Sequence, residues 1–179
     1  RSAAQQHPQD ASLIWGQAAA HKGLRDRTAA EGAYQRCLEL EPVNPACHFA
    51  LGVLFLEGLP QHAQDLPELK HAETWFQRGI NSQPGFAANH WGVGMAHQRA
   101  NRPSMALDAY IRCAELAPDD TRCYPAMHIV AEMSHRTPEL QAFLDRSAGI
   151  SEVAADQREA MHQDRDSHLR LAWVRDDIE

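Results

Sequence analysis

Apolar residues recur at spacings of three and four along most of the chain, which is the pattern of helices that bury one face. Within residues 28–40 the apolar stripe consists of Ala30, Tyr34, Cys37, Leu38 and Leu40. Polar or proline-bearing turns interrupt the pattern at regular intervals. It predicts helix pairs at residues 11–40, 45–84, 87–118 and 121–150, followed by a more polar helix at 151–179.

Two local signals refine these boundaries. Thr28, with Glu31 three residues later, has the pattern of a capping box and predicts the start of a helix. Residues 58–67 carry Pro60 and Pro67 and predict a connector that is longer than the other turns.

The helix pairs are repeats of one another. Aligning three alanines also aligns three aromatic residues and three prolines: Ala30, Ala72 and Ala106; Tyr34, Phe76 and Tyr110; Pro42, Pro84 and Pro118. A small residue lets two helices approach closely, a ring fills the space to the next pair, and a proline ends the helix. The intervals between successive prolines are 42 and 34 residues.

These landmarks resemble the tetratricopeptide repeat family over residues 11–150, because 34 residues is the period of that repeat. The 42-residue unit, with its longer connector, is similar to the Sel1-like branch of the same superfamily. The resemblance implies an all-α, right-handed α-solenoid of about four helix-turn-helix hairpins plus a C-terminal helix. The fourth unit departs from the pattern, because His128 and Leu140 stand where small residues are usual.

The same alignment predicts the domain organisation. Residues 1–10 are polar and lack periodicity, so we expect a flexible N-terminal arm. Residues 11–150 form the repeat domain. Residues 151–179 form a C-terminal capping helix, since the terminal units of repeat arrays are commonly polar.

The four cysteines form two pairs with identical spacing. Nine residues separate Cys37 from Cys47, and nine separate Cys113 from Cys123. In the repeat frame each pair joins the end of one hairpin to the start of the next, so the spacing favours two disulfides. The alternatives are reduced cysteines packed as small apolar residues or a metal site. Disulfides would place the chain in an oxidising compartment such as a periplasm, a secretory lumen or the mitochondrial intermembrane space.

Composition narrows the classes of partner. The formal net charge is -7 and the isoelectric point is near 5.9, which argues against nucleic acid or an anionic membrane as the main partner. No apolar stretch approaches the roughly 20 residues that span a bilayer, so we expect no direct membrane insertion. The chain carries no signal-peptide pattern, but it begins with Arg1 and not with Met, so we interpret it as a processed or trimmed product.

No catalytic or cofactor motif is present in the sequence, and we expect neither an enzyme nor a bound cofactor. Among eleven histidines, His90 and His97 share a seven-residue spacing with His128 and His135. Neither pair has the i, i+4 spacing of helical zinc sites. Packing roles are therefore the favoured interpretation, and a metal-storing protein is the alternative.

The family resemblance also implies a binding surface. In tetratricopeptide proteins the first helix of each hairpin lines a concave groove that holds a peptide or a helix. Carried over by position, the fifth residue of each repeat is Trp15, Phe49, Trp91 or Pro125. The residues four positions later are Ala19, Val53, Met95 and Ile129, and those three positions later again are Lys22, Leu56, Gln98 and Glu132. Members that clamp a carboxylate use Lys, Arg and Asn at these positions, and this chain has few of them.

The expected peptide-binding residues are therefore mainly apolar: Trp15, Phe49, Val53, Leu56, Trp91, Met95, Gln98 and Ile129. They imply a non-catalytic scaffold, assembly factor or chaperone that binds an apolar peptide or helix. An accessory domain that positions a substrate for a larger enzyme is one alternative. Self-occlusion of the groove is another, because the C-terminal helix carries Leu169, Leu171, Trp173 and Val174.

Overall fold

In the computed structural model, the described residues are 16, 20, 26–60, 63 and 65–163. Every regular element within these ranges is helical, and no β-strand occurs among them. The expected N-terminal arm, most of the expected first helix, including Trp15, and the chain after residue 163 lie outside the described residues.

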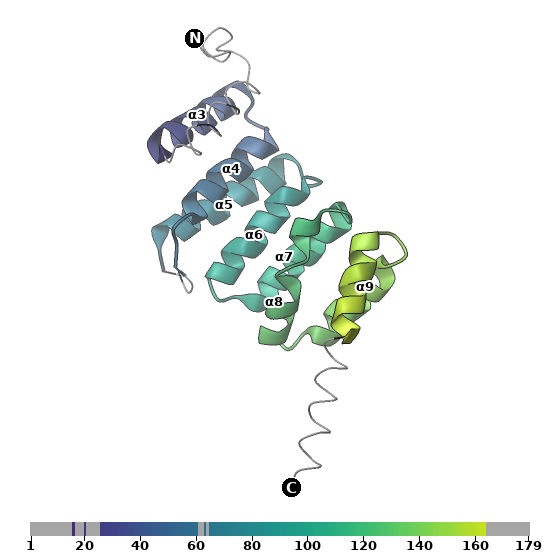
Figure 1. Cartoon of the computed structure of the whole chain (residues 1–179). Helices are drawn as coiled ribbons and strands as arrows, with labels where there is room; N and C mark the ends of the chain where they lie inside the picture. The colour runs from purple at the N-terminus through teal and green to yellow at the C-terminus, as the bar shows by residue number, and fades with distance from the viewer. Residues whose placement is uncertain (1–15, 17–19, 21–25, 61–62, 64, 164–179) are drawn as a thin grey trace, which may run out of the picture.

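The helices are stacked as hairpins in an elongated array (Figure 1). After α3 (Arg27–Leu40) come the hairpins of α4 (Pro45–Leu56) with α5 (Pro67–Ser82), α6 (Ala87–Arg99) with α7 (Pro103–Leu116), and α8 (Met127–Met133) with α9 (Thr137–Ser147). A 3₁₀ helix, η1 (Thr121–Cys123), precedes α8, and residues 152–163 are helical. The prediction of an all-α array of hairpins is confirmed.

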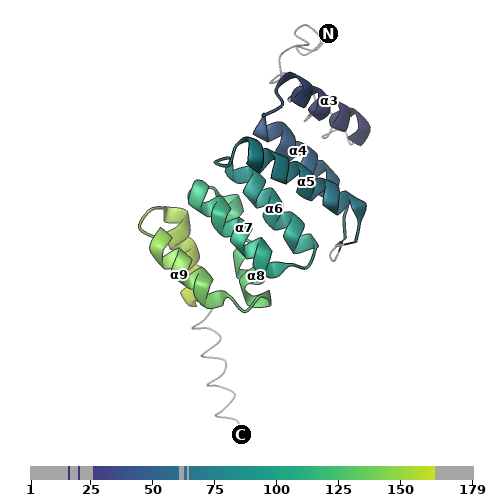
Figure 2. The same cartoon turned by 180° about the vertical axis from the view of Figure 1, so that it is seen from behind.

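The first and second helices of the hairpins lie on opposite sides of the array. Helices α4, α6 and α8 face the viewer in Figure 1, and α5, α7 and α9 face the viewer when the molecule is turned (Figure 2). Helix α6 contacts both helices of the preceding hairpin, α4 and α5. Each hairpin is thus packed on the previous one, as expected for a solenoid.

The aligned aromatic residues fill the space between hairpins, as the repeat pattern predicts. Phe76 of α5 is fully buried, and its ring lies against the backbones of Gly52 in α4 and Gly92 in α6. A Cβ on either glycine would lie 2.4 Å or less from that ring. Tyr110 occupies the equivalent place beside Gly94. These glycines are required because the ring and two helix backbones share one small volume.

The helix starts follow side-chain capping, with one difference from the sequence prediction. Asn44 caps α4 by accepting hydrogen bonds from the backbone amides of Ala46 and Cys47, both at 3.1 Å. The prediction that Thr28 caps the preceding helix is wrong: α3 begins at Arg27, and Asp26 accepts from the Ala29 amide at 3.1 Å. The carboxylate of Asp26, two residues before Thr28, therefore takes the capping role predicted for the Thr28 hydroxyl.

The fourth hairpin departs from the prediction of a helix that begins at Thr121. The chain forms the single turn η1, then a break at residues 124–126, and only then the seven-residue α8. Pro125 has no amide hydrogen to donate, so it interrupts the helical hydrogen bonds. The Tyr124 hydroxyl donates instead to the Pro118 carbonyl at 2.7 Å, which fixes the break against the end of α7.

The long connector of the 42-residue unit packs back on the array. The Ala63 amide donates to the Arg99 carbonyl at 2.8 Å, and the Arg99 guanidinium donates to the Leu59 carbonyl. Ala63 is 2% exposed and shares one apolar cluster with Leu56 and Phe76. The connector therefore extends the core beside the C-terminal ends of α4 and α6.

Both predicted cysteine pairs are joined at disulfide distance. The Sγ atoms are 1.97 Å apart in Cys37–Cys47 and 2.00 Å apart in Cys113–Cys123. All four side chains are fully buried. Each bond links a helix, α3 or α7, to the first turn of the hairpin that follows it, at the places in the chain that the repeat frame predicts.

Candidate ligand-binding face

The first helices of three successive hairpins carry a row of apolar side chains. We define the first-helix face by five of the expected residues, Phe49 and Val53 of α4, Trp91 and Met95 of α6, and Ile129 of α8. The first four are half-buried, and Ile129 is 54% exposed. Exposed apolar side chains on neighbouring helices are costly in water unless something covers them.

Aromatic contacts make part of this face continuous. The ring centroids of Phe49 and Trp91 lie 5.9 Å apart, and Phe49 is also 5.9 Å from the buried Phe76. Both separations fall within the range in which aromatic pairs attract each other. The core therefore holds the rings of Phe49 and Trp91 in place, and both side chains stay partly exposed.

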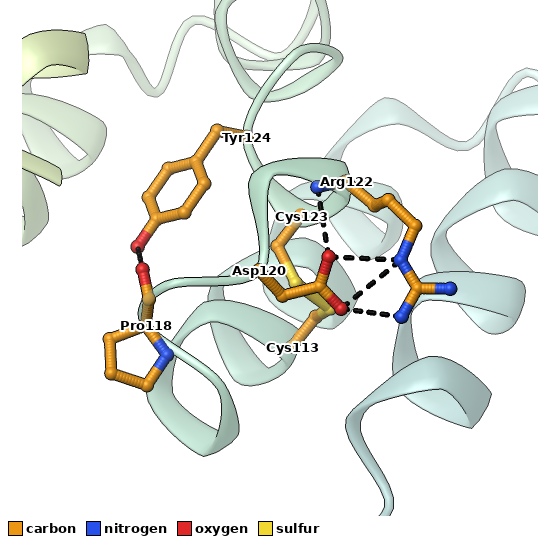
Figure 3. Close-up of a disulfide and its surroundings, with 6 residues drawn as sticks. All are labelled: Cys113, Pro118, Asp120, Arg122, Cys123 and Tyr124. Carbon is orange, nitrogen blue, oxygen red and sulfur yellow. Dashed lines mark hydrogen bonds and ion pairs between the residues drawn. A yellow bond between two sulfur atoms is a disulfide. The ribbon is translucent and has the colours of Figure 1, made fainter. Parts of the chain in front are cut away.

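A cation extends the row beyond Trp91. The Arg122 guanidinium carbon lies 5.6 Å from the centroid of the Trp91 ring, within cation–π range. Figure 3 shows how Asp120 holds this guanidinium: its carboxylate accepts from Nε at 2.9 and 3.1 Å and from Nη2 at 2.6 Å. The hydrogen bonds from Arg122 hold the pKa of Asp120 below its ordinary value, although burial opposes this shift.

Two of the other expected residues make contacts within the protein. Leu56 is only 6% exposed, because it shares its cluster with Ala63 of the connector. Gln98 accepts a hydrogen bond from the Tyr110 hydroxyl at 2.9 Å. Burial raises the pKa of Tyr110 well above its ordinary value, so this phenol stays protonated and donates. Leu56 lacks the exposure that a ligand contact needs, and Gln98 satisfies a buried hydroxyl.

Sequence reasoning missed Arg122 as a neighbour of the apolar row. The sequence did contain a signal: the residue before the second cysteine is Ala46 in the first pair but the charged Arg122 in the second pair. Pro125, expected in the fifth position of the fourth unit, lies instead in the break between η1 and α8. Arg122 thus lies beside the Trp91 side chain at this junction.

A separate cavity of about 400 Å³ lies between α5 and α6. Its lining residues are mostly polar: Glu73, Thr74, Gln77, Arg78, Asn81, Val93 and His97. His97 Nδ1 is buried without a hydrogen-bond partner, and Glu73 Oε1 lies 3.7 Å from it. Arg102 already pairs with that carboxylate at 2.9 Å. Phe55 stands at the equivalent position in the preceding unit.

Burial lowers the pKa of His97, while Glu73 and Asp108 raise it and Arg102 lowers it further. The unfolded chain therefore takes up a proton below about pH 6.5 that the folded chain does not. We expect the free energy of unfolding to fall as pH decreases from 7 to 5, and His97→Phe to weaken this dependence. Urea unfolding at each pH measures it.

The matched control is His71→Gln, because His71 is exposed. His48, whose pKa burial also lowers, remains in both variants. The pKa values of the Asp120 and Glu139 carboxyl groups are also lowered, and these groups change the free energy of unfolding only below the pH range compared here. If the free energy of unfolding of His97→Phe falls between pH 7 and 5 as steeply as that of the unmodified chain, His97 is not the source of the pH dependence.

Two other classes of site are absent from the described part of the chain. No group of three or more His, Cys, Asp or Glu side chains lies close enough there to hold a metal ion. No helix among these residues is both long enough and apolar enough to span a bilayer.

Comparison with known proteins gives matches in structure alone. No family model matches the sequence, and no curated protein matches it. Solved structures do match: TTC0263, a tetratricopeptide protein of Thermus thermophilus, has a TM-score of 0.66 at 13% identity and covers 89% of this chain and 84% of its own. MamA of Desulfovibrio magneticus RS-1 has a TM-score of 0.59 at 14% identity, covering 82% and 78%.

A third match includes a bound peptide. The first tetratricopeptide domain of Spaghetti (RPAP3), bound to the HSP90 peptide SRMEEVD, has a TM-score of 0.60 at 14% identity. It covers 69% of this chain and 92% of its own. At such identities the matches establish the architecture and not a shared ligand. The chain folds as a tetratricopeptide-type helical repeat.

Proposed function

We propose that this chain is a non-catalytic scaffold or assembly factor that binds an apolar segment of another protein on its first-helix face. The observation that supports this most directly is the row of accessible apolar side chains on α4, α6 and α8. A partner segment that covers these side chains removes apolar area from water, which is the main driving force for such association. Peptide binding by the RPAP3 domain supports this class of partner.

The proposed setting is extracytoplasmic, in a periplasm or an oxidising lumen. Two buried disulfides support this, because cytosolic thiols are normally kept reduced. The chain's acidic balance, with a net charge of -7, supports a protein partner over nucleic acid.

A selection from a phage-displayed library of random dodecapeptides tests the proposed face. We expect enriched peptides to be apolar, and Ile129→Asp to weaken their binding at least about tenfold, because a carboxylate would have to be desolvated at the contact. Fluorescence polarisation with a labelled enriched peptide measures the dissociation constant.

Ile150→Asp is the matched control, since Ile150 is 75% exposed and lies outside the first-helix face. We expect this variant to bind like the unmodified chain. Equal weakening by both substitutions, or enrichment of peptides that lack apolar residues, would contradict the proposed face.

Self-occlusion makes a different prediction for the same measurement. If the C-terminal segment with Leu169 and Trp173 covers the face, a stop after residue 163 increases the affinity for the enriched peptide. An unchanged affinity after this truncation contradicts self-occlusion and leaves an external segment as the ligand.

A further inference from the structure

The two disulfide junctions share a capping side chain three positions before the second cysteine, but they differ in charge. At the first junction Asn44 caps the following turn, Ala46 comes next but one, and Cys47 forms the disulfide. At the second junction Asp120 accepts from the backbone amide of Arg122 at 3.0 Å, and Cys123 forms the disulfide. The second junction therefore carries an ion pair, Asp120 with Arg122, where the first has an amide and a methyl group.

The surrounding contacts hold this ion pair in one place. Cys123 is fully buried in its disulfide, and its amide donates to the Asp120 carbonyl at 3.1 Å. Tyr124 is anchored by its hydroxyl on the Pro118 carbonyl (Figure 3). Arg122 lies between two anchored residues, so its backbone has little freedom. Its side chain is 52% exposed and that of Asp120 is 18% exposed.

The ion pair leaves little net charge beside the Trp91 ring. The carboxylate of Asp120 occupies the edge of the Arg122 guanidinium that carries Nε and Nη2, which is an edge suited to bidentate contact with a carboxylate. An incoming acidic side chain would be left with the remaining edge of the guanidinium, where the neighbouring carboxylate of Asp120 would repel it. The net charge of -7 over the whole chain adds further repulsion.

We propose that the Asp120–Arg122 pair, anchored by the Cys113–Cys123 disulfide, is a charge-neutral cap on Trp91 that makes the first-helix face select apolar segments without acidic residues over acidic segments. This inference rests on the proposed function and specifies the chemistry of its ligand. Arg122 is a positioning residue here, because it acts on the ligand through Trp91.

Two labelled probes of equal length test the selection. One is SRMEEVD, the peptide bound by the RPAP3 domain. The other is the amidated peptide SRMLLVA, in which apolar residues replace the acidic ones. We expect the full chain to bind SRMLLVA at least about tenfold more tightly than SRMEEVD by fluorescence polarisation.

The decisive variant is Asp120→Asn. Asparagine keeps the cap on the following turn, as Asn44 does at the matched junction, but it removes the charge that neutralises Arg122. We expect this variant to bind SRMEEVD several-fold more tightly than the unmodified chain, while its affinity for SRMLLVA stays nearly constant. Asn44→Asp, which changes the charge at the other junction, is the control and leaves the ratio unchanged.

A spectroscopic measurement tests the cap without a ligand. In the chain labelled with 5-fluorotryptophan, the ¹⁹F resonance of Trp91 is assigned by Trp91→Phe. We expect Arg122→Ala and the double variant Cys113→Ala/Cys123→Ala to shift this resonance. Cys37→Ala/Cys47→Ala removes an equivalent disulfide and should leave the resonance in place.

The outcomes separate the two proposals. Binding of neither probe at millimolar concentration would overturn the proposed face. If SRMLLVA binds, but Asp120→Asn has the same ratio of affinities for SRMLLVA and SRMEEVD as the unmodified chain, the neutral cap alone is overturned. A Trp91 resonance that is insensitive to Arg122→Ala would also overturn it.

Discussion

Loss of both disulfides is expected to lower the free energy of unfolding by about 5 kcal/mol, or about 2.5 kcal/mol for each bond. Each bond closes a short loop, since the paired cysteines are 10 positions apart in the sequence. A cross-link restricts the unfolded chain, and the loss of that restriction destabilises the fold. This effect is large because small domains are usually stable by only about 5 to 15 kcal/mol.

Urea unfolding followed by circular dichroism measures the effect in three variants: Cys37→Ala/Cys47→Ala, Cys113→Ala/Cys123→Ala, and the chain with all four substitutions. We expect the two double variants to lose similar stability, and the quadruple variant to lose about the sum. The unmodified chain in excess dithiothreitol should approach the quadruple variant. Unfolding that is the same with and without reductant would contradict a covalent contribution to stability.

The repeat frame could be predicted from sequence because its landmarks are local and chemical. Ala72 and Phe76 are on one face of a helix, and Pro84 ends the same unit, so their spacing alone identifies a hairpin. The cysteine pairing followed from that frame, because equivalent positions in successive units lie at equivalent junctions. Cys37–Cys47 and Cys113–Cys123 are joined as the frame predicts.

Features that depend on the path of a loop could not be predicted. The burial of Leu56 follows from the way that the connector returns to Arg99, through a hydrogen bond between backbone groups that any residue could form. The ion pair between Asp120 and Arg122 depends on the single turn η1, where the sequence pattern predicts an ordinary helix. Loop packing is set by tertiary contacts, and helical periodicity does not report them.

The middle junction of the array differs from the two that carry disulfides. Gly79 and Asn89 occupy the positions that correspond to Cys37 with Cys47 and to Cys113 with Cys123. A Cβ on Gly79 would lie 2.5 Å from the Asn89 Cγ, so the two residues are in direct contact. Asn89 is fully buried, and although its Nδ2 donates to the Pro45 carbonyl at 3.2 Å, its Oδ1 has no partner.

This geometry predicts that a third disulfide forms in the double variant Gly79→Cys/Asn89→Cys. The Asn89 Cγ already lies where the Sγ of a cysteine at position 89 would reach, and the substitution removes a buried oxygen that lacks a hydrogen bond. The new loop has the same length as the two natural ones. We therefore expect the oxidised form of the variant to have a free energy of unfolding about 2.5 kcal/mol higher than its reduced form.

The comparison is made within one sequence, in a chain whose natural cysteines are replaced by alanine, so that the only disulfide is the engineered one. Urea midpoints of the oxidised and reduced forms then give the stabilisation directly, and mass after alkylation shows whether the bond has formed. Gly79→Cys alone is the control: it places a side chain against the Asn89 amide and should destabilise the fold, because the two groups cannot share that volume. Two thiols that stay open to alkylation after oxidation would show that the middle junction lacks the geometry of its neighbours.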